Sequence, residues 1–171
     1  QSEARNAEMI EWYTEPRIVK TLLQAQDLGL NAMISRGDEH ITSVLARYWD
    51  QEGKMQWVAQ TDSHRPPVEA AKYCLDRGAA ACFLHGGVVD RCLAQGETDS
   101  IERFVRAVQD AGKPVGIAGH MPEDFLWAEQ NLALDFYMVC YYNPSPRQIV
   151  AHHDPQAQER YLESDRLERV A

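Results

Sequence analysis

The sequence has no long apolar run and little positive charge, and each absence argues against one class of binding partner. Apolar runs such as 79–84 are far too short to cross a bilayer, which takes about 20 apolar residues. Lys and Arg number 17 against 26 Asp and Glu, which gives a net charge of −9 at pH 7. Acidic chains bind polyanions poorly. We therefore expect neither nucleic acid nor a membrane as a partner.

Cysteine is also scarce, and no two cysteines form a C-x-x-C pair. The four are Cys74, Cys82, Cys92 and Cys140, and two of them fall inside apolar, strand-like runs. A buried thiol in such a run acts as a small hydrophobic side chain. The chain also lacks an opening basic segment followed by an apolar one, so no signal peptide is visible. We predict a reduced, cytoplasmic protein.

What the sequence does contain is a recurring unit of one strand followed by one helix. With 171 residues, 44% of them hydrophobic, the chain suits a single domain with a sizeable core. Apolar spacing and helix-ending glycines predict helices over 15–28, 38–49, 68–77, 100–111 and 123–131. Apolar runs predict strands over 30–35, 55–61, 79–84, 114–118 and 134–140. The segment 145–171 differs, and we predict a polar C-terminal loop and helix there.

Strands that alternate with helices indicate an α/β fold with a parallel sheet. The strands are nearly continuous apolar runs, which predicts a sheet covered on both faces. Two architectures fit this pattern, an open doubly wound sheet and a (β/α)8 TIM barrel. No G-x-G-x-x-G follows a predicted strand, so the dinucleotide fingerprint of the open sheet is absent.

The ends of the predicted strands carry a succession of short motifs. In order they are Gly29-Leu30-Asn31, His85, Val115-Gly116-Ile117 and Tyr142-Asn143-Pro144. This succession resembles strands two to six of the aldo/keto reductase barrel, over roughly 17–144. The resemblance implies a TIM barrel of the NADP-dependent oxidoreductase kind. The chain also resembles a group of bacterial barrel proteins, which implies no particular activity.

The resemblance also implies an incomplete barrel and a changed chemistry. A full barrel takes about 250 residues, so this chain has room for about five strands. It is then a fragment that lacks barrel segments, or it pairs with another chain, for example as a homo-oligomer. The reductases' catalytic Asp falls on Ile34, their Lys on Thr61 or Gln60, and their Tyr has no counterpart. Only His85 is kept, so a divergent NAD(P)H oxidoreductase is an alternative reading rather than the first.

Parallel barrels place their active sites at the C-terminal ends of the strands. Polar side chains gather at those positions here. We predict that four of them are catalytic, namely Arg36, Asp38, His85 and His120. Five others are predicted to bind substrate, namely Gln60, Gly86, Gly87, Tyr141 and Asn143.

His85 and His120 end neighbouring strands, so their imidazoles are expected to converge. They could serve as acid and base, because His titrates near neutral pH, or hold a divalent metal together with His40. Arg36 and Asp38 could position a carboxylate, and backbone N–H groups at the two glycines could approach an anion. The sequence favours a barrel enzyme acting on a small polar metabolite. A non-catalytic barrel that binds a metabolite or a partner is the other alternative.

Overall fold

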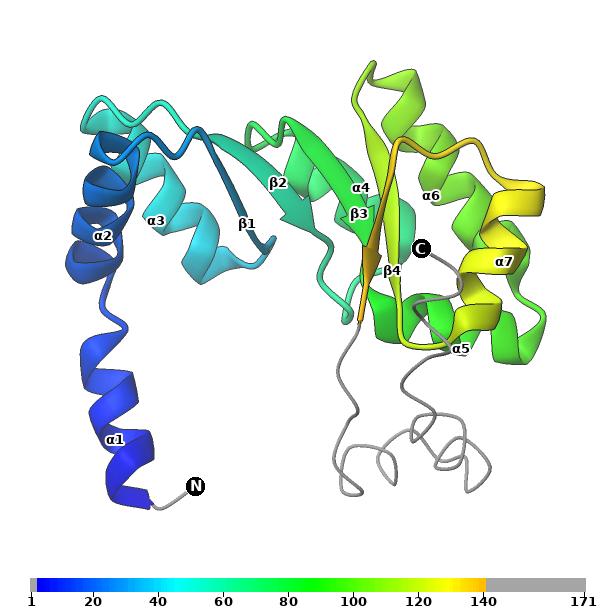
Figure 1. The fold of residues 1–171 in the computed structure, drawn as a ribbon, viewed down its shortest axis with the longest axis horizontal. Coiled ribbons are helices and arrows are strands. Elements are labelled where there is room, and N and C mark those ends of the chain that lie inside the picture. Colours follow the sequence, from blue (N-terminus) through cyan, green and yellow to red (C-terminus); the bar gives the residue numbers. More distant parts are fainter. Residues whose placement is uncertain (1–2, 141–171) are drawn as a thin grey trace.

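The computed structural model describes residues 3–140, in which strands and helices alternate as the sequence predicts (Figure 1). The strands are β1 (Ala32–Arg36), β2 (Gln56–Gln60), β3 (Ala81–Leu84), β4 (Val115–Gly119) and β5 (Phe136–Val139). The helices are α1 (Glu3–Trp12), α2 (Glu15–Asp27), α3 (Glu39–Asp50), α4 (Pro67–Leu75), α5 (Gly86–Gln95), α6 (Thr98–Asp110) and α7 (Pro122–Asn131). The tail predicted over 145–171 lies outside the described residues.

The five strands form one parallel sheet whose order follows the chain, β1-β2-β3-β4-β5. Right-handed crossovers that always step in the same direction put every connecting helix on the same side of the sheet. A doubly wound sheet would instead reverse its order at a switch point. Figure 1 shows the sheet curling with the helices along its outer side. The fold is therefore α/β, an incomplete TIM-type barrel, as predicted.

The main core lies between the outer face of the sheet and the helices. Successive strand residues point to opposite faces, so every second side chain is buried under a helix. On β2, Trp57 and Ala59 are fully buried, whereas Val58 between them is only partly buried. On β1, Ile34 points to the inner face and stays 56% exposed. Within the described residues the helices cover one face. All four residues of β3 are nevertheless buried, whereas no residue of β1 is, so the prediction that both faces are covered holds at β3 and fails at the edge strand β1.

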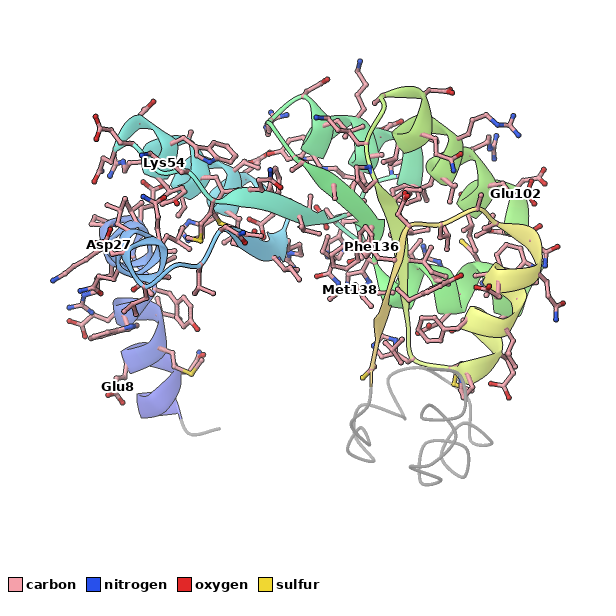
Figure 2. The ribbon with its side chains drawn as sticks, turned by 45° about the horizontal axis from the view of Figure 1, so that its top comes forward. Glu8, Asp27, Lys54, Glu102, Phe136 and Met138 are labelled. Atoms are coloured by element: carbon pink, nitrogen blue, oxygen red, sulfur yellow. The ribbon has the colours of Figure 1, made fainter. Side chains whose placement is uncertain are left out.

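Part of the inner face is filled by the last strand. Phe136 of β5 packs edge-on against Phe83 of β3, with ring centroids 6.1 Å apart. Its ring also lies over Gly116, where a Cβ would come within 2.7 Å of it. Figure 2 labels Phe136 and Met138 on this strand, while labelled charged residues such as Glu102 lie at the periphery. The inner face is consequently apolar next to the strand ends.

Prolines and glycines mark the helix boundaries as the sequence predicts. Pro67 and Pro122 are the first residues of α4 and α7, where a missing N–H costs nothing. Gly78 and Gly112 follow α4 and α6 with φ of 89° and 67°, a conformation that L side chains rarely adopt. Within 3–140, no helix is both long and apolar enough to span a membrane.

Two helices were not predicted, α1 and α5. Helix α5 opens with Gly86-Gly87, a poor helix-forming pair that reads in the sequence as a turn. It forms because Val88, Val89 and Cys92 bury one face against the core. Gly96, with φ of 72°, then ends it. This helix matters for function because it carries a side chain of the candidate site.

Candidate active site

A cavity of about 290 Å³ lies at the C-terminal ends of the strands, where parallel barrels place their active sites. Four residues predicted for the site line it, namely Gln60, His85, Gly86 and His120. Apolar side chains from the inner face form much of the remaining wall, including Ile34, Phe83, Ala118 and Met138. The cavity thus joins an apolar wall to two imidazoles.

His85 is held at the junction of β3 and α5. Its backbone N–H donates to Thr61 Oγ1 at 3.0 Å, and Thr61 is fully buried. Its ring Nδ1 accepts the N–H of Gly87 at 3.1 Å, which makes His85 the N-cap of α5. Since Nδ1 accepts a hydrogen bond, the proton of the neutral ring lies on Nε2. Burial, and then the nearby His120, hold the pKa of His85 below its ordinary value, which keeps the ring neutral.

His120 follows β4, and its Nδ1 atom donates a hydrogen bond where that of His85 accepts one. Its Nδ1 lies 2.7 Å from Asp90 Oδ2, and its backbone N–H donates to Asp90 Oδ1 at 3.2 Å. The hydrogen bond to Asp90 raises the pKa of His120. Burial opposes ionisation of Asp90, but its hydrogen bonds to His120 outweigh burial and lower its pKa. An ionised carboxylate can only accept, so Nδ1 carries the proton and the lone pair of the neutral ring lies on Nε2.

Gly86 allows the His120 ring to lie against the first turn of α5. A Cβ at Gly86 would lie 3.0 Å from His120 Cε1 and 3.3 Å from the backbone nitrogen of Gly119. A side chain would therefore push the His120 ring away from the first turn of α5. The Gly87 N–H donates to His85 Nδ1, and Gly86 lines the cavity, so the substrate-binding role predicted for these glycines stays a prediction.

Asp90 and its neighbour Asp124 are the residues that sequence reasoning missed. Asp90 lies in the unpredicted helix α5, where it binds the His120 ring but does not line the cavity. Asp124 lies in the first turn of α7 and is only 5% exposed. The spacing of Val88, Val89 and Cys92 was the available signal for α5. No comparable signal in the sequence pointed to either Asp.

Arg36 and Asp38 come together at the end of β1, outside the cavity lining. Arg36 Nε lies 2.9 Å from Asp38 Oδ2, and the Arg36 side chain is half exposed. Asp38 Oδ1 accepts the N–H of Ile41 at 2.9 Å and thereby caps α3. Burial raises the pKa of Asp38, but Ile41 and Arg36 outweigh it and the pKa lies below its usual range. The pair has a structural task, and its predicted role toward substrate stays a prediction.

The remaining predicted site residues are not brought together. His40 is exposed in the first turn of α3 and does not line the cavity. Within 3–140, no three His, Cys, Asp or Glu side chains are grouped so as to hold a metal ion. Tyr141 and Asn143 lie outside the described residues. The metal site formed by His85, His120 and His40 therefore stays a prediction.

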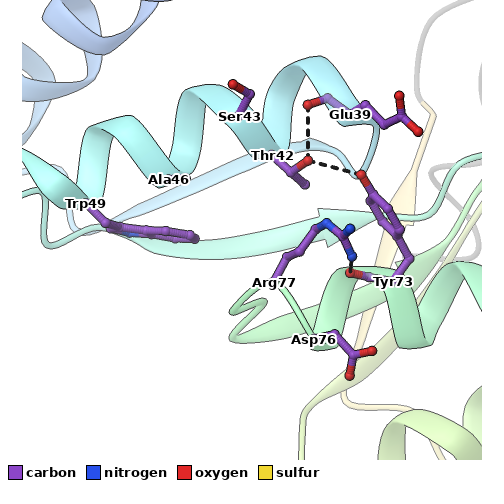
Figure 3. Close-up of a pocket in the computed structure, with 8 residues that line it drawn as sticks. All are labelled: Glu39, Thr42, Ser43, Ala46, Trp49, Tyr73, Asp76 and Arg77. Atoms are coloured by element: carbon purple, nitrogen blue, oxygen red, sulfur yellow. Dashed lines mark hydrogen bonds between the residues drawn. The ribbon is translucent and has the colours of Figure 1, made fainter.

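A second, larger hollow of about 600 Å³ lies on the outer layer, between α3 and α4 (Figure 3). Across it, Thr42 Oγ1 is 3.1 Å from the Tyr73 hydroxyl, and the Arg77 guanidinium stacks 3.6 Å from the Tyr73 ring centroid. Arg65 also stacks on the same ring, at 4.1 Å. These contacts join two neighbouring helices. The hollow is on the helix layer rather than at the strand ends where the imidazoles meet.

Comparison with known proteins bears on the fold. No family model matches the sequence, and no curated protein gave a match to it. Among solved structures, the chain is similar to one described as "QR15, an Aldolase", with a TM-score of 0.56 and 13% identity. The similarity covers 74% of this chain and 61% of that one. At this identity it shows a shared barrel fold, and this chain spans less than two thirds of the aldolase's length.

This finding corrects the resemblance to the aldo/keto reductases. The structure is similar to a barrel of a different group, and nothing in the comparisons supports the reductase or its NADP dependence. The motifs that suggested the reductases include short apolar runs that end in His85 or in Tyr142-Asn143. Any parallel barrel needs such runs, because its strands are buried and its strand ends carry polar side chains. Their order therefore reports the architecture and not the chemistry.

Proposed function

We propose that this chain forms part of a barrel enzyme that moves a proton at the carbon next to a carbonyl group in a small polar metabolite. One observation carries the proposal: the Nδ1 atoms of the two cavity histidines have opposite hydrogen-bond roles. Nδ1 of His85 accepts from a backbone N–H, whereas Nδ1 of His120 is bound to a carboxylate. The two rings consequently offer a donor and an acceptor through their Nε2 atoms.

His120 is assigned as the general base. Asp90 fixes the ring and the tautomer in which Nε2 carries the lone pair, and it stabilises the imidazolium that forms when a proton is taken up. The raised pKa of His120 has the direction that a base needs for work near neutral pH. Asp90 does not line the cavity, so it acts as a positioning residue.

His85 is assigned as the group that polarises the carbonyl oxygen. It is neutral because burial lowers its pKa, and its Nε2–H can donate to an oxygen on which negative charge develops. The Gly87 N–H holds the ring by its Nδ1 atom, so the donor does not need to reorganise during the reaction. A base and an electrophile facing one cavity support enolisation, the step shared by many isomerases and carbon–carbon lyases.

The similarity to an aldolase fits this class in fold alone. Aldolases that work through a Schiff base need a lysine at the reacting carbonyl. No lysine lines the described cavity, so the histidine pair is the better candidate for the chemistry. The volume of about 290 Å³ suits a small molecule.

Setting and partners remain predictions. The thiols of Cys74, Cys82 and Cys92 are free and buried, which supports a reduced, cytoplasmic setting. In the described sheet β1 and β5 are the edge strands, and the inner face between them is partly exposed. Unpaired edges favour pairing with further strands, supplied by a homo-oligomer or by additional barrel segments.

The test is proton exchange with solvent. The full chain is incubated in D2O with a panel of aldehydes, hydroxyketones and 2-oxo acids, and loss of the α-proton signal is followed by NMR. We expect exchange with at least one compound, its loss in H120A, and a reduction of about 10²-fold or more in D90N and H85A. H64A changes an exposed histidine outside the cavity and is the matched control. Exchange undiminished in H120A, or no exchange across the panel, would contradict the proposal.

A further inference from the structure

Asp124 is a buried carboxyl group close to the candidate base. It lies in the first turn of α7 and is 5% exposed, and its Oδ2 accepts the N–H of Met121 at 3.3 Å. The same oxygen would be 3.2 Å from a Cβ at Gly119, so the carboxyl group packs against the end of β4. Among the ion pairs of the described residues, none joins Asp124 to a Lys or Arg.

The group that Asp124 does face is another carboxyl. Its carboxyl group binds the backbone N–H of Met121, and the Asp90 carboxyl group binds that of the preceding residue, His120, together with the His120 ring. The two carboxyl groups therefore lie side by side and interact. Two ionised carboxylates side by side in a buried site repel each other, and a proton held between them removes that repulsion. Burial, and then the contact with Asp90, raise the pKa of Asp124 to about 8. The other titratable groups acting on this pair are His120, His85 and Glu123.

We propose that Asp90 and Asp124 hold one proton between them, and that Asp124, as its donor, positions the Asp90 carboxylate against His120. Asp90 then accepts from the backbone N–H and the Nδ1–H of His120 and from the Asp124 hydroxyl. These bonds fix the carboxylate from both sides. The catalytic meaning of this arrangement rests on the proposed function, whereas the shared proton itself does not.

An ordinary helix cap would behave differently. Asp124 also occupies the third position of α7 and accepts the N–H of Met121, as a capping carboxylate does. The N–H of Met121 stabilises the ionised form of such a cap, so the pKa of a capping Asp124 would lie near or below its ordinary value of 3.8. The two roles therefore predict opposite protonation states at neutral pH.

The experiment is an NMR titration of the full chain labelled at the Asp carboxyl carbons and the His rings. We expect the Asp124 carbon to titrate near pH 8, and the His120 ring signals to move in the same step. D124N keeps a neutral donor beside Asp90 but cannot titrate, so this step should vanish while the His120 Nδ1–H stays bonded. E123Q, which changes the exposed neighbour in the same helical turn, should keep the step and lower its pH only slightly, because Glu123 is the smallest of the groups that raise the pKa of Asp124.

Titration of the Asp124 carbon in the ordinary Asp range would overturn the proposal, as would an unchanged step in D124N. The wild-type titration needs no variant, so the test survives a D124N protein that does not fold. It also needs no substrate. A shared proton without solvent exchange would refute the proposed function alone, and exchange without a shared proton would refute this inference alone.

Discussion

The shared proton has a thermodynamic consequence that D124N should reveal. In the folded protein the pKa of Asp124 is raised from its ordinary 3.8 to about 8. Between these values the folded chain holds a proton that the unfolded chain has released, so this group contributes less stability as pH rises. D124N binds no proton in either state. Its stability relative to the wild type should therefore increase by about 1.4 kcal/mol per pH unit inside the window.

Urea unfolding at about pH 5 and about pH 7 measures this difference. D124N should gain about 2.7 kcal/mol on the wild type between the two conditions. Both chains contain His85 and His120, so the contributions of these two histidines cancel to first order. E123Q should run parallel to the wild type, because Glu123 is exposed. Parallel curves for D124N and the wild type would refute the reasoning, since an ionised helix cap predicts no such slope.

Three further outcomes follow from packing and capping. Gly86→Ala should displace the His120 ring, because the added Cβ would lie 3.0 Å from Cε1, and the His120 NMR signals should shift; unchanged signals would show that the Cβ is accommodated without moving the ring. Trp57→Ala should cost about 3–5 kcal/mol in urea unfolding, because the side chain is fully buried, whereas Trp12→Ala at a 63% exposed site should cost far less. Asp38→Ala should cost about 1 kcal/mol through the lost cap of α3, seen as faster amide exchange in its first turn, and unchanged exchange would argue against that cap.

The elements with strong local signals were predicted well. Pro67 and Pro122 begin helices, Gly78 and Gly112 follow them, and the apolar runs between them are strands. These signals are local because fixed φ, a missing N–H and a missing Cβ act on the residue that carries them. Helix α5 was missed because its N-cap, His85, is not one of the usual capping residues, and because burial of Val88 and Val89 is a tertiary effect.

The candidate site was predicted in part. His85, His120 and Gln60 do meet at one cavity, because the C-terminal ends of parallel strands share one edge of the sheet. Arg36 and Asp38 bind each other outside that cavity lining, and Asp38 caps a helix there. The family resemblance was wrong, because short strand-end motifs follow from the barrel architecture and are not specific to one chemistry.

By itself the sequence determined the alternation of strands and helices, the acidic charge and the two imidazoles at neighbouring strand ends. Each of these depends on residue type and on spacing along the chain. Only the tertiary structure decided which nitrogen of His120 carries the proton, because Asp90 binds its ring from 30 positions away, whereas His85 is set by its near neighbour Gly87 once α5 has formed. It also brought Asp124 to Asp90, 34 positions away in the sequence (124 − 90). Protonation depends on burial and on neighbouring charge, and both come into being only when the chain folds.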